Sequence, residues 1–122
     1  MKFQTIGNPN DSLIIMLPGS FCPSSGLNYL YEKLKDDYCI VLVEYNGHYE
    51  NSTFSSRQNE AKGIVEYIQK QNIHTIKMIY GQSMGAEIAI ELFKQLEKTN
   101  IDVDYCFLDG ASCIKLPYLY KK

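Results

Sequence analysis

The stretch that decides the fold is residues 76–85, which read IKMIYGQSMG. Residues 76–80 form a short, mostly apolar run, which is typical of a strand buried on both faces of a parallel sheet. Residues 81–85 then place Ser83 between two glycines, and a helical pattern begins near Met84. The sequence therefore predicts a strand that turns sharply into a helix, with Ser83 at the turn.

Apolar runs of similar length recur outward from this stretch, and each predicts a further strand. The strong runs occupy residues 13–17, 39–43 and 103–108. A weaker leading run at residues 3–6 suits a strand at the edge of the sheet. Strands that alternate with helices in units of about 30 residues are typical of βαβ crossovers. The sequence therefore predicts an α/β fold with a largely parallel sheet.

Three helices are predicted between these strands by apolar side chains at i, i+3, i+4 and i+7. They lie within residues 27–34, 61–68 and 89–96. Ser55 and Gln58 match a capping box ahead of the second helix. Each helix has one apolar stripe, so each can pack against a sheet.

The composition is that of one globular domain. The chain has 122 residues, of which 45% are hydrophobic and 21% charged, both close to globular averages. The net charge is −2, and no stripe of Lys and Arg indicates a nucleic acid or an anionic membrane as a partner. The start of the chain is too polar for a signal peptide, and residues 13–17, the longest apolar run, are too few to span a bilayer. We therefore expect a cytoplasmic protein.

The four cysteines give little support for a zinc or dithiol site, because no two of them have C-x-x-C spacing. Cys39 and Cys106 lie inside apolar runs, where we expect buried, reduced thiols. Cys22 and Cys113 fall in predicted loops, and their state stays open.

Gly81 and Gly85 flank Ser83 for a steric reason. A serine at the tip of so tight a turn has a strained backbone, and side chains on its neighbours would collide. The turn lifts the hydroxyl above the sheet, beside the positive end of the following helix and its free N–H groups. Ser83 is therefore the candidate nucleophile. The alternative is a tight glycine turn whose serine caps a helix.

A G-x-S-x-G turn between a strand and a helix is the nucleophile elbow of the α/β-hydrolase family, which this chain resembles. A second likeness follows the strand at residues 13–17, where Pro18-Gly19 stands in place of the family's His-Gly pair. The resemblance implies an oxyanion hole made by the backbone N–H groups of Ser20 and Met84, with Phe21 as the alternative to Ser20.

A third likeness lies in residues 44–52, which resemble the family's D-x-x-G-H-G-x-S loop. Glu44 replaces the aspartate, and Tyr49 stands where glycine is usual. In the family this histidine shapes a loop beside the pocket. The resemblance therefore implies a structural role for His48 rather than that of a catalytic base.

The resemblance runs from about residue 12 to residue 109, which corresponds to the third to sixth strands of the family fold. It implies a partial α/β-hydrolase fold, with a mostly parallel sheet and helices on both faces. We expect residues 1–122 to be the N-terminal part of a single domain. The last strands and any cap domain would then be missing.

The resemblance implies a catalytic triad that residues 1–122 do not complete. The family's chain order is Ser, then acid, then His, but His48 and His74 both precede Ser83. The base is therefore expected beyond residue 122. Asp109 is a candidate acid, because some family members carry their acid just after this strand. The alternative for Asp109 is a turn-forming Asp-Gly pair.

The resemblance implies a serine hydrolase that acts on esters, thioesters or other small acyl compounds, and this chemistry needs no metal or cofactor. The isolated chain is expected to be inactive because it lacks the triad histidine. The alternative is a non-catalytic protein that binds a ligand or a partner on the same scaffold. An unpaired sheet edge also predicts a homodimer or a complementing chain as a partner.

Overall fold

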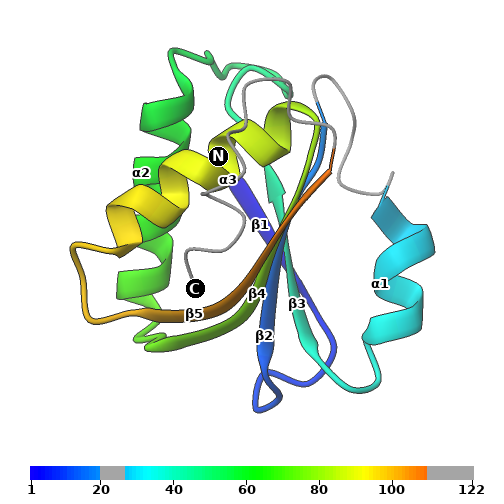
Figure 1. Ribbon diagram of the computed structural model, residues 1–122. Helices are drawn as coiled ribbons and strands as arrows, with labels where there is room; N and C mark the ends of the chain where they lie inside the picture. The colour runs from blue at the N-terminus through cyan, green and yellow to red at the C-terminus, as the bar shows by residue number, and fades with distance from the viewer. Residues whose placement is uncertain (20–26, 110–122) are drawn as a thin grey trace.

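The computed structural model describes residues 1–19 and 27–109 of the chain. Five strands and three helices alternate along these residues, as Figure 1 shows. The strands are β1 (Lys2–Ile6), β2 (Leu13–Leu17), β3 (Cys39–Glu44), β4 (Thr75–Gln82) and β5 (Asp102–Asp109). The helices are α1 (Asn28–Leu34), α2 (Arg57–Lys70) and α3 (Met84–Leu96). Each predicted strand and helix is present.

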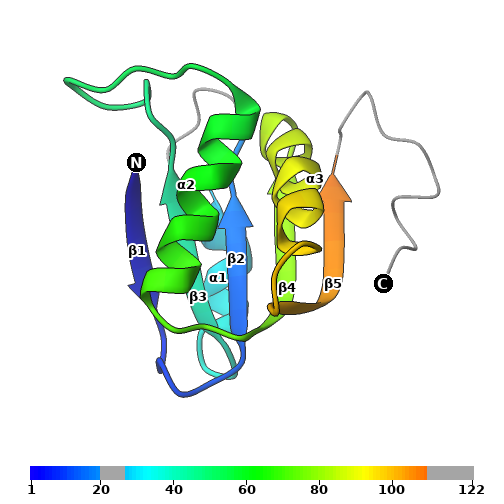
Figure 2. The same ribbon diagram turned by 90° about the vertical axis from the view of Figure 1, so that its left-hand side faces the viewer.

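The strands form one sheet in the order β1-β3-β2-β4-β5. The pairs β2–β3, β2–β4 and β4–β5 are parallel, whereas β1 at the edge is antiparallel to β3. Ile15 of the central strand pairs with Val41 on one side and Ile79 on the other. The four parallel strands therefore end at the same edge of the sheet (Figure 2), where ligands bind in open α/β sheets.

Helices α2 and α3 cover one face of the sheet (Figure 2). Their apolar stripes meet the side chains of β2, β3 and β4 that point to this face, and the contact buries most of them. The fully buried members include Ile15, Val43, Ile64, Ile79 and Leu92. This is the larger of the two apolar cores in the part of the chain that the structure describes.

Helix α1 covers the opposite face, behind β2 and β3 in Figure 2. Leu27 and Leu30 pack there against Ile14, Met16 and other side chains of the central strands. The cover does not extend over β5, where Tyr105 is 60% exposed and Phe107 is 56% exposed. Helices thus lie on both faces, as predicted, but they bury the two faces unequally.

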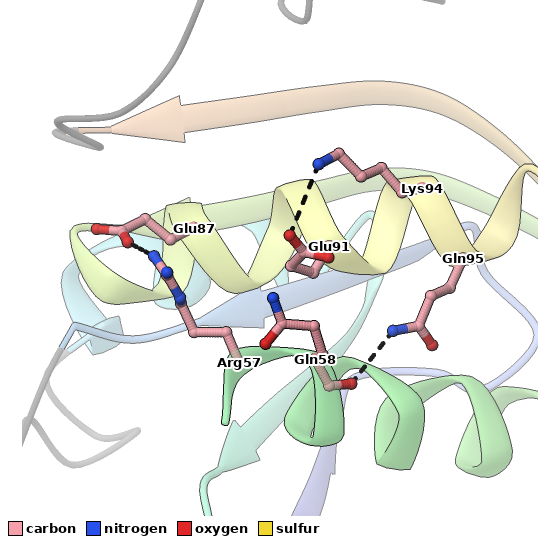
Figure 3. Close-up of polar contacts among 6 residues, drawn as sticks. All are labelled: Arg57, Gln58, Glu87, Glu91, Lys94 and Gln95. Carbon is pink, nitrogen blue, oxygen red and sulfur yellow. Dashed lines mark hydrogen bonds and ion pairs between the residues drawn. The ribbon is translucent and has the colours of Figure 1, made fainter. Parts of the chain in front are cut away.

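Polar contacts fasten the first turn of α2 across α3 (Figure 3). Arg57 forms an ion pair with Glu87, which lies in the first turn of α3. Gln95 Nε2, near the other end of α3, donates to the backbone oxygen of Gln58 at 3.2 Å. The two contacts therefore join the first turn of α2 to both ends of α3.

The N-terminus of α2 differs by one residue from the predicted capping box. Ser56 is the N-cap, and its hydroxyl accepts a hydrogen bond from the N–H of Asn59 at 3.0 Å. Ser55 instead accepts a hydrogen bond from the Asn59 side chain at 2.7 Å. The prediction was wrong because two adjacent serines can both cap, and the local sequence does not choose between them.

Cys39 is buried and Cys106 is half-buried, and both are free thiols. Burial raises the pKa of Cys39 and raises that of Cys106 to about 11, so both stay protonated at neutral pH. Cys22 and Cys113 lie outside the described residues. None of the helices in the described part of the chain has the length and apolarity to cross a membrane.

Candidate active site

Ser83 occupies the turn between β4 and α3, with backbone angles φ 56° and ψ −117°. A positive φ is sparsely populated for a residue with a side chain, and holding it costs on the order of 1–3 kcal/mol. Such strain persists only where the surrounding structure enforces it. The turn places Ser83 at the edge of the sheet where the parallel strands end and at the N-terminus of α3.

Gly81 and Gly85 permit this turn, because neither position has room for a side chain. A Cβ on Gly81 would lie 2.4 Å from the carbonyl oxygen of Gly85 and 2.7 Å from the Cα of Ala86. A Cβ on Gly85 would lie 2.1 Å from the oxygen of Leu17. All these obstacles are backbone atoms, which cannot move aside as a flexible side chain could. Both glycines are therefore sterically required.

Hydrogen bonds of the backbone hold Ser83 from both sides. Its N–H donates to the carbonyl oxygen of Asp109 at 2.7 Å. This bond directly follows Gln82–Asp109, the last residue pair of β4 and β5. Its own carbonyl oxygen accepts from the N–H of Ala86 at 2.9 Å, which opens α3. The turn is thus fastened to β5 as well as to the two elements that it joins.

Met84 is the first residue of α3. Its N–H therefore has no acceptor within the helix. This end of the helix also carries the positive part of its dipole. The position suits a donor to a negatively charged oxygen bound at Ser83. The other predicted donors, Ser20 and Phe21, lie outside the described residues.

Pro18 leads toward that segment, and its carbonyl oxygen contacts both Tyr45 and the start of α3. The hydroxyl of Tyr45 donates to it at 2.7 Å in a buried contact. A Cβ on Gly85 would lie 2.6 Å from the same oxygen, so the backbone of Gly85 is also close to it. The start of the loop after β2 therefore packs directly against the residue that follows Met84.

The loop after β3 carries His48, whose ring packs edge-on against the ring of Tyr45 at a centroid distance of 5.3 Å. The N–H of His48 donates to the carbonyl oxygen of Tyr45 at 3.2 Å, which closes a turn. Gly47 has φ 86°, and a Cβ there would lie 2.9 Å from the backbone nitrogen of Phe54. These contacts agree with the role in loop structure that the resemblance implies for His48.

Glu60 of α2 fixes the same loop and was not singled out from the sequence. Its side chain is 1% exposed and accepts hydrogen bonds from the backbone N–H of Asn46 at 2.9 Å and from Asn46 Nδ2 at 3.0 Å. The sequence did contain a signal for this buried carboxylate. Glu60 lies four residues before Ile64, and positions four apart share one face of a helix, so Glu60 falls on the buried stripe of α2. A carboxylate on an apolar stripe needs a partner.

Asp109 ends β5 beside Ser83, and its carboxylate accepts a hydrogen bond from the hydroxyl of Tyr80 at 3.3 Å. Tyr80 is buried on the face that α1 covers, and its ring stacks on Phe107 at 5.6 Å. Burial, then the hydroxyl of Tyr29, then Asp109 raise the pKa of Tyr80 well above its usual value. Tyr80 therefore stays a neutral donor to Asp109 at physiological pH.

His74 lies just before β4, at the end of the strand remote from Ser83. A strand of eight residues extends about 26 Å, so the two side chains are not brought together. Its carbonyl oxygen accepts from the N–H of Asp102, which joins the starts of β4 and β5. Within residues 1–19 and 27–109, no cluster of three or more His, Cys, Asp and Glu side chains is placed to hold a metal ion.

No family model and no curated protein matches this sequence. Solved structures do match the fold. A protein from Desulfitobacterium hafniense assigned to the α/β-hydrolase family superposes with a TM-score of 0.84 at 24% identity, over 91% of this chain and 44% of that one. A carboxylesterase from Nitrososphaera gargenis gives a TM-score of 0.77 at 16% identity, over 98% and 45% of the two chains. A protein from Acinetobacter baumannii assigned as a lipase gives a TM-score of 0.75 at 20% identity, over 87% and 36% of the two chains.

The chain therefore has part of an α/β-hydrolase fold, and the predicted fold class is confirmed. It spans less than half the length of each of these structures. At identities below 25%, the likeness concerns the fold and leaves the chemistry to be argued from the site itself.

Proposed function

We propose that this chain carries the nucleophile of a serine hydrolase, and that Ser83 is that nucleophile. The observation that supports the proposal most directly is the strained turn at Ser83, with φ 56° between β4 and α3. Gly81 and Gly85 are both sterically required to form it. A strained serine at the carboxyl edge of a parallel sheet, opening a helix, is the arrangement of a nucleophile elbow.

In the proposed reaction, Ser83 Oγ attacks the carbonyl carbon of an acyl substrate and forms a tetrahedral intermediate. The N–H of Met84 and an N–H of the loop after Pro18, from Ser20 or Phe21, stabilise the negative oxygen. The leaving group departs with a proton, and water then releases the acyl group from Ser83. The step needs a base that takes the proton from Ser83.

We assign that base to a histidine beyond residue 122, in a longer form of the protein. Residues 1–122 would then be the N-terminal part of one α/β-hydrolase domain. Both histidines of the chain precede Ser83, which does not suit the order Ser, acid, His. Asp109 is a secondary candidate for the acid, because it ends β5 beside Ser83, although its carboxylate is already engaged by Tyr80.

The substrate class that fits is esters, thioesters and other small acyl compounds. Two neighbours carry the names carboxylesterase and lipase, which favours esters within this class for the present fold. The chemistry requires no metal ion or cofactor, because the serine and the backbone donors supply the nucleophile and the charge stabilisation.

The test compares two lengths of the protein with a p-nitrophenyl ester as substrate. The 122-residue chain is expected to show no turnover above a Ser83→Ala control, since a serine without its base is a poor nucleophile. A form extended past residue 122 is expected to turn over, and Ser83→Ala should abolish that turnover and the labelling by a fluorophosphonate. Turnover of the extended form that survives Ser83→Ala would refute Ser83 as the nucleophile.

The second candidate is a non-catalytic protein that binds a ligand or partner on this scaffold. The position of both histidines before Ser83 favours it for the chain as given. An extended form that neither turns over esters nor reacts with the fluorophosphonate, yet is folded, would support this candidate over hydrolysis.

A further inference from the structure

Tyr45 is the first residue after β3 and the largest of the fully buried side chains among the described residues. Its hydroxyl donates to the carbonyl oxygen of Pro18 at 2.7 Å, and the two residues are 27 positions apart in the chain. A hydroxyl buried this deeply must find an acceptor, because leaving it unpaired costs on the order of 1–3 kcal/mol. The hydrogen bond therefore joins the loop after β3 to the loop after β2.

The oxygen that Tyr45 binds is also in contact with the nucleophile turn. A Cβ on Gly85 would lie 2.6 Å from the Pro18 oxygen, so the backbone of α3 abuts the same group. The Pro18 carbonyl oxygen is therefore in contact with both the Tyr45 hydroxyl and the helix after Ser83.

Fixing this carbonyl also fixes the next N–H. A peptide unit is planar and trans, so the direction of the Pro18 C=O sets the direction of the Gly19 N–H. Proline has no N–H of its own. The peptide held by Tyr45 thus directly precedes Ser20 and Phe21, one of which supplies the proposed donor to the oxyanion at Ser83.

Tyr45 is itself held in place. Asn46, its neighbour, is bound by the buried Glu60 of α2 through two hydrogen bonds. The ring of His48 packs against its ring at 5.3 Å. Burial, and then the charge of Glu60, raise the pKa of Tyr45 well above its usual value, so the hydroxyl stays a donor throughout the neutral range.

We infer that Tyr45 is a positioning residue for the oxyanion loop: its hydroxyl orients the Pro18–Gly19 peptide against the turn that carries Ser83. The inference rests on the proposed function of Ser83. It gives the loop after β3 a task that neither the elbow motif nor the likeness of His48 to a family loop assigns.

The kinetic test uses Tyr45→Phe in a form extended past residue 122, with Tyr49→Phe as the matched control. Both variants lose one hydroxyl from the same loop, but that of Tyr49 donates to Asn46 Oδ1 at 3.3 Å and not to Pro18. We expect Tyr45→Phe to lower kcat by about tenfold or more, since loss of a whole oxyanion donor costs about 10²–10³. KM should change little, because the oxyanion that the loop N–H stabilises forms only in the transition state. A kcat unchanged in Tyr45→Phe, or lowered equally in Tyr49→Phe, would overturn the inference.

A second measurement does not depend on turnover. In NMR spectra of the 122-residue chain, Tyr45→Phe should shift the Pro18 carbonyl carbon and the Gly19 N–H, whereas Tyr49→Phe should leave both in place. Unchanged resonances in a folded Tyr45→Phe variant would reject the inference whatever the activity. Shifted resonances together with an inactive extended wild type would instead reject the proposed hydrolase and keep Tyr45 as the residue that holds the loop.

Discussion

On the face of the sheet that α2 and α3 cover, Ile64, Ile79 and Leu92 are fully buried, whereas on the face that α1 covers, Tyr105 and Phe107 are more than half exposed. One strand shows the difference by itself. Cys106 and Leu108 of β5 pack against the core beneath α3, while Tyr105 and Phe107 lie largely uncovered.

The difference means that one face of the sheet supplies most of the burial that stabilises the fold, whereas the exposed side chains of β5 remain accessible for contacts. Apolar burial stabilises by about 25 cal/mol per Å² removed from water. Most of the stability therefore resides on the face that α2 and α3 cover, here called the closed face. The same face carries α3, whose first residues form the turn at Ser83. The surface of β5 around Tyr105 and Phe107, here called the open face, is less buried and contributes less to folding. Its aromatic side chains are left for another segment or chain to contact.

The largest expected effect is on the closed face. Leu92→Ala should lower the free energy of unfolding by about 3 kcal/mol, because it removes a fully buried side chain and leaves a cavity. Phe107→Ala on the open face should cost about 1 kcal/mol, mainly the stacking contact with Tyr80. Urea unfolding of both variants measures the two values. Leu92→Met, which nearly keeps the volume, serves as the control. Equal costs for the two alanine variants would show that the faces do not differ in this way.

The sequence predicts the strands and helices of both faces, but it does not predict the contacts between residues that are far apart in the chain. Periodicity placed every strand and helix, because an apolar run or stripe is a local property. The turn at Ser83 was predictable from its two glycines, but the reason for Gly85 was not. Its obstacle is the backbone of Leu17 and Pro18, which is remote in the chain. The contact of Tyr45 with Pro18 escaped prediction for the same reason.

The second effect concerns association of two or more copies of the chain through β5. We propose that the chain forms dimers or larger aggregates through the edge of β5, which pairs with β4 on one side. Phe107→Ser should weaken this association. Added salt should strengthen it, because the exposed Asp102, Asp104 and Asp109 repel a second copy at low salt. Sedimentation velocity at increasing protein concentration measures both trends. A monodisperse wild-type monomer at high concentration would contradict the proposal.

The smallest effect is at the surface of the closed face. Arg57→Gln should cost about 0.2–1 kcal/mol, since it removes a partly exposed ion pair between α2 and α3. Glu87→Gln should cost somewhat more, because Glu87 also lies in the first turn of α3, where a negative charge is favourable. Urea midpoints at low and high salt test the order. Costs that do not shrink with salt would mean that packing, not charge, is lost.

The hydrogen bond from the Ser83 N–H to the Asp109 carbonyl bears on any attempt to divide this fold into complementing fragments. A break between α3 and β5 would leave the serine turn on one piece and its acceptor on the other. A break after Asp109 keeps the turn and its acceptor on one piece. The end of β5 is therefore a better place to divide the chain than the loop between α3 and β5, and a split reporter built on the proposed hydrolase would be cut there.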